Sequence, residues 1–307
     1  MFHVLDVEAL SKLVNLVLPF EVAKTCSKLS DSGATIPTYF HQNIPRARTT
    51  HLKKYFGFSN EKQDYFDKKL ERNFSRKGEL DFGMIEKLMN YSENCLLQEH
   101  PVRNMKRESE LWNEIVRATP RPKYVRKAAE WIREMLFGEH EYAAIHWRYN
   151  SRDWGKHCPK WPSCKIFKLG IETPEIFAQK ITKLLTEKNI FKIYIAAPPD
   201  QATTVANFRY EIQKIDAKFE VLVGTDAEKL LEARRSLLFP NCSFLKKHFN
   251  NIFSITEQEI CFHSKLFIRA DQSTWSGNIR QERIAWAAQN STSENLELSK
   301  VLDLKLD

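Results

Sequence analysis

From Pro120 onward, short apolar runs alternate with longer segments whose apolar residues recur at helical spacing. This alternation is typical of βαβ units, in which helices join neighbouring parallel strands. It predicts an α/β fold for this part of the chain. Ligands of such sheets bind beyond the carboxyl ends of the strands, so the loops that follow the strands are the first places to look for a site.

The apolar runs predict strands, and the helical spacing predicts the segments between them. Glycine and proline at Gly155, Pro159 and Pro162 indicate a loop, and Pro174 suits the first turn of a helix. Strands are expected at residues 142–148, 192–197, 219–223 and 265–268, and helices at residues 124–137, 201–215, 226–235, 255–264 and 277–290, with a further helix starting at Pro174.

The first part of the chain has a different pattern of apolar and charged residues. An apolar stripe at helical spacing runs from Leu10 to Leu18, and polar, charge-dense segments with little periodicity follow it. A chain of 307 residues is long enough for two domains. We therefore predict a domain at residues 1–118 and a second at residues 119–307.

The net charge limits the kinds of partner that the chain is expected to bind. The net charge is +8 and the pI is about 9.0, which suits a polyanion such as a nucleotide diphosphate. The basic residues are dispersed, and no zinc-finger or RNA-binding signature accompanies them, so no nucleic-acid partner is predicted. No apolar run is long enough for a transmembrane helix. Glycine is scarce and no Gly-rich phosphate loop is present, so phosphate would have to bind at side chains and a helix N-terminus.

One candidate site lies at the end of the first expected strand, where His146 and Arg148 are followed by Asp153. Alternation along a strand places His146 and Arg148 on the same face. An arginine there could offer a fork of donors to a diphosphate and stabilise the charge that grows on a leaving nucleotide. Asp153 could orient the arginine or accept from a base or a ribose. A strand-end His and Arg with a surface ion pair is the alternative, and spacing alone favours it.

A second candidate comprises Ser273, Thr274 and Trp275, just before the last expected helix. Hydroxyls and backbone N–H groups meet at a helix N-terminus, where the partial positive charge favours an anion. Ordinary helix capping by serine or asparagine would explain the same residues without any ligand. The sequence alone leaves this alternative open.

No metal site is expected, because there is no Asp-x-Asp sequence and His157, Cys158 and Cys164 lack the paired spacing of a zinc site. A Cys158–Cys164 disulfide, or two thiols, is expected instead. The start of the chain does not form a signal peptide, so we expect a cytosolic protein or a chain that starts downstream of its targeting segment. The glycosylation pattern Asn-x-Ser/Thr gives weak support for a secretory route. It occurs at Asn73, Asn90, Asn241 and Asn290.

Together, the two candidates resemble the protein O-fucosyltransferase family. Residues 145–148 (Ile-His-Trp-Arg) and 153–154 (Asp-Trp) are similar to the family's His-x-Arg…Asp-Trp motif. Residues 267–268 (Phe-Ile), 273–275 (Ser-Thr-Trp) and 281–283 (Gln-Glu-Arg) are similar to its Phe-Ile…Ser-Ser-Phe…Arg-Glu-Arg segment. The resemblance extends over roughly residues 120 to 290, and the order and spacing of the motifs carry it.

The resemblance implies a glycosyltransferase-B fold, with two Rossmann-like domains facing a cleft. It implies inverting, metal-independent transfer of fucose from GDP-fucose to a protein Ser or Thr hydroxyl, with no cofactor, in the endoplasmic reticulum or Golgi lumen. Carried over, Arg148 would grip the β-phosphate and assist the departure of GDP. His146 and Asp153 would shape the same pocket. The phosphate and nucleotide site would be lined by Ser273, Thr274 and Trp275.

Two departures from the family pattern open alternatives. The family's Gly-rich loop ending in Asn-Gln is not found, so the first domain is expected to be incomplete. Ala197-Pro198-Pro199 replaces the family's Ala-Thr-Asp, so an aspartate contact is lost unless Asp200 substitutes. The chain could therefore be a non-catalytic descendant that binds a nucleotide sugar or a protein. A third reading is a related fucosyltransferase that acts on glycans.

Overall fold

The computed structural model describes residues 38–39, 97–98, 110–149, 163–238, 247–287 and 294–304. Contacts between Cα atoms divide the chain into two compact units, residues 11–112 and residues 113–307 together with 1–10. The described part of the smaller unit includes a parallel pair of short strands, β1 (Thr38–Tyr39) and β2 (Leu97–Gln98). The two predicted domain ranges stay predictions.

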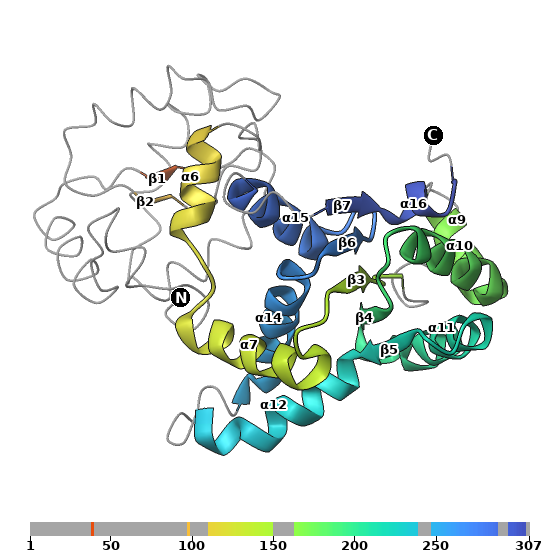
Figure 1. Cartoon of the computed structure of the whole chain (residues 1–307). Helices are drawn as coiled ribbons and strands as arrows, with labels where there is room; N and C mark the ends of the chain where they lie inside the picture. The colour runs from red at the N-terminus through yellow and green to blue at the C-terminus, as the bar shows by residue number, and fades with distance from the viewer. Residues whose placement is uncertain are drawn as a thin grey trace, which may run out of the picture. The chain divides into compact units, whose positions relative to one another are not determined.

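The larger unit is built on a parallel sheet with the strand order β5-β4-β3-β6-β7 (Figure 1). All strand pairs of this sheet are parallel, so the sheet has one carboxyl edge and one amino edge. The α/β class predicted from the alternation is confirmed. The strands are β3 (Tyr142–His146), β4 (Lys192–Ala196), β5 (Glu220–Val223), β6 (Leu266–Arg269) and β7 (Glu294–Glu297).

Helices cover both faces of this sheet, as expected for parallel strands joined by crossovers. On one face lie α9 (Cys164–Glu172), α10 (Pro174–Glu187), α11 (Ala202–Ile215) and the short α16 (Leu298–Val301). On the other face lie α7 (Lys123–Phe137), α12 (Gly224–Leu238), α14 (Phe249–Phe262) and α15 (Thr274–Trp286). Helix α6 (Glu110–Ala118) precedes α7, and the 3-10 turn η5 (Pro199–Gln201) precedes α11.

Each face has its own hydrophobic core, and the strands contribute to the two cores alternately. In β3, Ala143 and Ile145 join the core beneath α10 and α11, whereas Tyr142 and Ala144 join the core beneath α7 and α14. Every residue of β3 is buried. Because side chains of successive strand residues point to opposite faces, a central strand without polar residues is buried on both sides. This is why the apolar runs of the sequence were sufficient to locate the central strands.

Several described elements were not expected from the sequence, among them α6, α16, α9 and β7. The segment with Gly155, Pro159 and Pro162 was expected to be a loop up to Pro174, but α9 occupies Cys164–Glu172; the Gly and Pro residues themselves lie outside the described part. Helix α9 contains Gly170 because a Cβ there would lie 2.2 Å from the Trp147 ring. A glycine inside a helix is usually unfavourable, and it hides the helical pattern.

Strand β7 was also missed, because its residues are polar and three of its four side chains are only half-buried at the edge of the sheet. Helix α15 begins at Thr274, three residues earlier than the expected start at Gly277. The stripe from Leu10 to Leu18 lies outside the described residues. Cys164 is in a disulfide whose partner lies outside them as well. Within the described ranges, no helix is both long enough and apolar enough to cross a membrane.

Candidate functional site

The two candidate segments meet at the carboxyl edge of the sheet. Strands β3 and β6 are neighbours, with Ile145 opposite Ile268. The chain therefore leaves both strands side by side, at His146 and at Arg269 respectively. Segments that the sequence separates by more than a hundred residues thus form a single site, as the rule for parallel sheets predicts.

His146 is buried at the end of β3, with 4% of its surface exposed. Its imidazole stacks on the indole of Trp275, with ring centroids 4.2 Å apart. Burial, assisted by the charge of Arg148, lowers the pKa of His146 from 6.5 to about 3. The ring is therefore neutral at physiological pH. Its Nδ1 atom is buried and has no hydrogen-bond partner among the described residues.

Trp147 anchors the strand extension that carries Arg148. Its backbone N–H donates to the carbonyl of Ala196 at 2.8 Å, and its indole N–H donates to Oε1 of Gln201 at 3.4 Å. The buried indole packs edge-on against the rings of Tyr149, Phe177 and Phe208. Arg148 itself is half-buried. Because its neighbours on both sides are fixed in the core, the backbone of Arg148 has little freedom.

On the opposite side of the site, Asp271 holds the chain beyond the end of β6 in place through hydrogen bonds. Its carboxylate accepts from the backbone N–H of Ser299 at 3.0 Å and from the Ser299 hydroxyl at 2.7 Å. Its backbone N–H donates to the Tyr149 hydroxyl at 3.1 Å. Burial raises the pKa of Tyr149 above its usual range, and the charge of Asp271 adds to this shift. The extensions of β3 and β6 are thus joined by a buried polar link.

Ser273 caps helix α15. Its backbone is extended, its Oγ accepts from the backbone N–H of Ser276 at 3.5 Å, and its carbonyl accepts from Gly277 at 2.9 Å. The helix cap that the sequence left open as an alternative is therefore present. Capping and anion binding do not exclude each other, because a helix N-terminus exposes several N–H groups.

Thr274 and Trp275 form the first turn of α15. Thr274 is exposed, whereas Trp275 is half-buried and its indole N–H donates to the Ser254 hydroxyl on α14 at 3.0 Å. Gln272 precedes this turn with a φ of 59°, and its side chain accepts from the hydroxyl of Ser163 at 3.1 Å. The turn is thus fixed to α14 on one side and to the start of α9 on the other.

The structure therefore places five of the predicted site residues at one edge. His146 and Ser273 are buried there. Trp275 and Arg148 are half-buried, and Thr274 is exposed. Asp153 lies outside the described residues. Asp200 stands exposed in η5, beyond the carboxyl end of the neighbouring strand β4.

Sequence reasoning did not find the supporting residues Tyr149, Ser163, Ser254 and Ser299, because their partners come from distant parts of the chain and no local pattern signals such pairs. In the described ranges, no group of three or more His, Cys, Asp or Glu side chains gathers as metal ligands.

Comparison of the structure with solved structures finds crystal structures of POFUT1. The complex of POFUT1 with GDP matches with a TM-score of 0.58 at 12% sequence identity, over 96% of this chain and 83% of that chain. The chain has the fold of POFUT1. The complex with GDP-fucose in crystal form I matches with a TM-score of 0.57 at 13% identity, over 96% and 82% of the two chains. Crystal form II, also with GDP-fucose, gives 0.56 at 14% identity.

These matches show the glycosyltransferase-B type of architecture that the sequence resemblance predicted. No protein-family model matches the sequence, and no curated protein matches it. At 12 to 14% identity, POFUT1 and this chain share the arrangement of the backbone, and the residues at the carboxyl edge must be argued from their own geometry.

Proposed function

We propose that this protein is a fucosyltransferase that binds GDP-fucose at the carboxyl edge of the β3–β6 pair and transfers fucose to a Ser or Thr hydroxyl of a protein. The observation that supports this most directly is the convergence of Arg148, His146 and the N-terminus of α15 at that edge. Solved structures with the same fold hold GDP and GDP-fucose.

In the proposed mechanism, Arg148 and the first turn of α15 hold the diphosphate. The guanidinium donates to the β-phosphate, and the N–H groups of α15 add their partial positive charge. As the bond from the sugar to the phosphate oxygen breaks, negative charge grows on the leaving GDP, and Arg148 stabilises it. The acceptor hydroxyl attacks the opposite face of the sugar, so the configuration inverts, and the hydroxyl proton is released to water. This arrangement assigns to Arg148 and the helix the charge stabilisation that a metal ion gives in other transferases.

His146 is proposed to shape the pocket rather than to move a proton. Because its pKa is lowered to about 3, its imidazole is a weak base and carries no charge that would compete with Arg148 for the phosphate. Its unpartnered Nδ1 can accept a hydrogen bond from the ligand, or donate one to the ligand in the other tautomer. Trp275 holds the ring in place by stacking.

Asp153 is proposed to orient Arg148 or to accept from the nucleotide, and Ser273 and Thr274 to contact the phosphates. Asp200 is the aspartate that could replace the missing family contact, since it is exposed beyond β4. The segment Ala197-Pro198-Pro199 that replaces the family's sequence is the observation that favours a second candidate function. In that reading the chain binds the nucleotide sugar without transferring it.

A calorimetric titration of GDP-fucose and of GDP into the full chain tests the proposal. We expect saturable binding of both, and a loss of roughly 10- to 100-fold in affinity for Arg148→Ala, as expected when charge-assisted hydrogen bonds to a phosphate are removed. Lys127→Ala is the matched control, because it removes an exposed positive charge from α7, which contributes no residue to the proposed donor site. Wild-type chain that is folded and does not bind GDP would overturn the donor site.

Turnover distinguishes the two candidate functions. We expect release of GDP from GDP-fucose to increase when a protein acceptor with Ser or Thr hydroxyls is added. Binding of GDP-fucose without release of GDP, across protein and glycan acceptors, would favour the non-catalytic candidate. Release with glycans only would indicate the related glycan-directed enzyme.

We also propose a location in the endoplasmic reticulum or Golgi lumen, on the basis of the family resemblance and the glycosylation patterns at Asn73, Asn90, Asn241 and Asn290. Treatment of the protein from its native cell with an N-glycan-removing enzyme should then increase its electrophoretic mobility. An unchanged mobility, together with a cytosolic distribution on fractionation, would contradict this location.

A further inference from the structure

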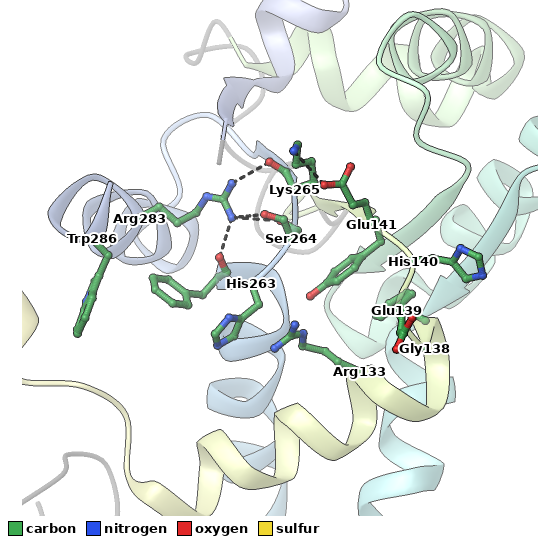
Figure 2. A pocket seen from close by; sticks show the side chains of 13 residues that line it. Arg133, Gly138, Glu139, His140, Glu141, His263, Ser264, Lys265, Arg283 and Trp286 are labelled. Carbon is green, nitrogen blue, oxygen red and sulfur yellow. Dashed lines mark hydrogen bonds and ion pairs between the residues drawn. The ribbon is translucent and has the colours of Figure 1, made fainter. Parts of the chain in front are cut away.

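A cavity of about 360 Å³ lies at the amino edge of the same sheet, away from the strand ends that form the proposed donor site. Tyr142 and Lys265, which lie at the amino ends of β3 and β6, line it together with the end of α7, the end of α14 and the end of α15 (Figure 2). Nothing in the proposed transfer reaction uses this cavity.

Arg133 lines this cavity without a carboxylate partner among the described residues. Its Nε atom is buried and has no hydrogen-bond acceptor among the described residues, and no carboxylate of the described ranges forms an ion pair with it. The phenol of Tyr142 lies beside the guanidinium. A guanidinium that lines a cavity without a carboxylate beside it favours an anionic occupant, because charge-assisted hydrogen bonds to an oxyanion are strong.

The carboxylates near Arg133 are already used or lie at the rim. Glu259, on α14, accepts from Arg121 at 2.7 Å and contacts Nε2 of His263 at 3.0 Å. Glu141 accepts from Lys265 at 2.9 Å, and Glu139 is exposed at the mouth of the cavity. The second guanidinium of the cavity, Arg283, has no carboxylate partner in the described ranges either, so the cavity interior carries an excess of positive charge.

The other walls are apolar and aromatic. Phe262 and Trp286 are half-buried and line the cavity beside Arg133 and His263. The same four residues also line a second cavity of about 500 Å³, so an occupant has room to extend along α7 and α15. A guanidinium next to aromatic walls fits an oxyanion attached to a flat apolar body, because the fork of donors binds the oxygens and the rings cover the body.

We propose that this cavity is a second ligand site, which binds a small organic anion consisting of a carboxylate on an aromatic or other flat apolar body. Arg133 binds the carboxylate through its guanidinium, and Trp286 and Phe262 cover the body. The site is independent of the donor site, because it lies at the opposite edge of the sheet and shares no residue with it.

Benzoate is the probe, and acetate and benzamide are its matched controls. Acetate has the carboxylate without the body, and benzamide has the body without the charge. A ligand that binds only the folded state raises the melting temperature in a saturable way. With the full chain at constant ionic strength, we expect benzoate to raise it saturably and acetate and benzamide to raise it much less. Equal effects of benzoate and benzamide would overturn the anion assignment, and no effect of any of the three at roughly 100 mM would overturn the site.

Variants then locate the site. Arg133→Gln should weaken benzoate binding roughly tenfold or more, whereas Lys127→Gln, which removes an exposed charge from the same helix, should not change it. Arg133→Lys should weaken benzoate binding to an intermediate extent. It replaces Arg133→Gln in the test if Arg133→Gln does not fold. Binding of GDP should be unchanged in the Arg133 variants. Benzoate binding that is the same in wild type, Arg133→Gln and Arg133→Lys would show that the anion binds elsewhere.

Discussion

Arg283 at the amino edge of the central sheet and Arg148 at the carboxyl edge have opposite surroundings. At the amino edge, Arg283 is 2% exposed and its guanidinium is saturated by backbone carbonyls, including those of Phe262, Ser264 and Glu294. At the carboxyl edge, Arg148 is half-buried next to a neutral imidazole and a helix N-terminus. An arginine whose donors are taken by backbone carbonyls and by the amide oxygen of Asn295 holds the fold together. An arginine placed beside other anion-binding groups is in a position to meet an anionic ligand.

The difference has a physical origin in the ends of strands and helices. The amino edge receives the last turns of α7, α14 and α15, whose terminal carbonyls lack partners within the helix. The carboxyl edge receives the first turn of α15, whose N–H groups lack them. The cation of Arg283 therefore satisfies carbonyls at the amino edge, whereas the N–H groups of the first turn of α15 favour an anion at the carboxyl edge. The predictions below test this contrast, from the largest effect to the smallest.

Removal of the guanidinium of Arg283 should have the largest effect on folding. Arg283→Ala would leave the carbonyls of Phe262, Ser264 and Glu294 and the amide oxygen of Asn295 without their donor. We expect the free energy of unfolding to fall by about 3–5 kcal/mol, measured by urea denaturation. Arg148→Ala should lower it by less than about 1 kcal/mol, while abolishing most of the nucleotide binding. Similar losses of stability in both variants would break the contrast.

The second prediction concerns acid and His146. Its pKa is about 6.5 when unfolded and about 3 in the folded protein, so the unfolded state binds the proton more tightly. Its contribution to stability is therefore present above pH 6.5 and is lost as the pH falls from 6.5 toward 3. At pH 5 the loss is about 2 kcal/mol relative to pH 7.

His146→Gln should have a flatter stability profile over this pH range, measured by urea denaturation at pH 7, 6 and 5. Trp275→Ala should raise the pKa of His146 toward its usual value, followed by the NMR shift of the imidazole protons, because the stacked indole excludes water from the ring. An unchanged pKa in Trp275→Ala would show that the remainder of the core is sufficient to bury the ring.

The N-terminal cap of α15 should contribute less to the free energy of unfolding than the neutral His146 does. Ser273→Ala removes the oxygen that accepts from the N–H of Ser276, and such caps are worth about 1 kcal/mol. We expect a loss of that size by urea denaturation. If Ser273 also contacts phosphate, the affinity for GDP should fall in addition, and Ser273→Thr should restore both. A normal affinity for GDP in Ser273→Ala would assign this residue to capping alone.

The smallest effect is expected for the exposed ion pair at the amino edge. Lys265 and Glu141 are 2.9 Å apart, with Glu141 exposed and Lys265 half-buried. Pairs of this kind contribute between about 0 and 1 kcal/mol. Lys265→Gln should therefore change the free energy of unfolding by less than about 0.5 kcal/mol, and a large loss would show that this edge tolerates no change in charge.

Much of the sheet was predictable because its central strands are buried on both faces. The run of residues 142–148 has no polar side chain before His146, so it could be recognised without knowledge of its neighbours. Strand β7 could not be recognised, because an edge strand is half-exposed and Glu294-Asn295-Leu296-Glu297 reads as a polar segment. Helix α9 was hidden by Gly170, which is explained only by the ring of Trp147 lying against it.

The sequence by itself determined the α/β class, the central strands, and the placement of His146 and Arg148 at a strand end ahead of a helix-capping serine. These features depend on local periodicity and on chemistry within a few residues, which the order of side chains specifies directly. The tertiary structure alone decided that Trp275 stacks on His146, that Asp271 joins the two strand extensions, and that Arg283 is saturated by backbone carbonyls. Each of these contacts joins residues distant in the chain, and only the packing of the strands side by side brings them within reach.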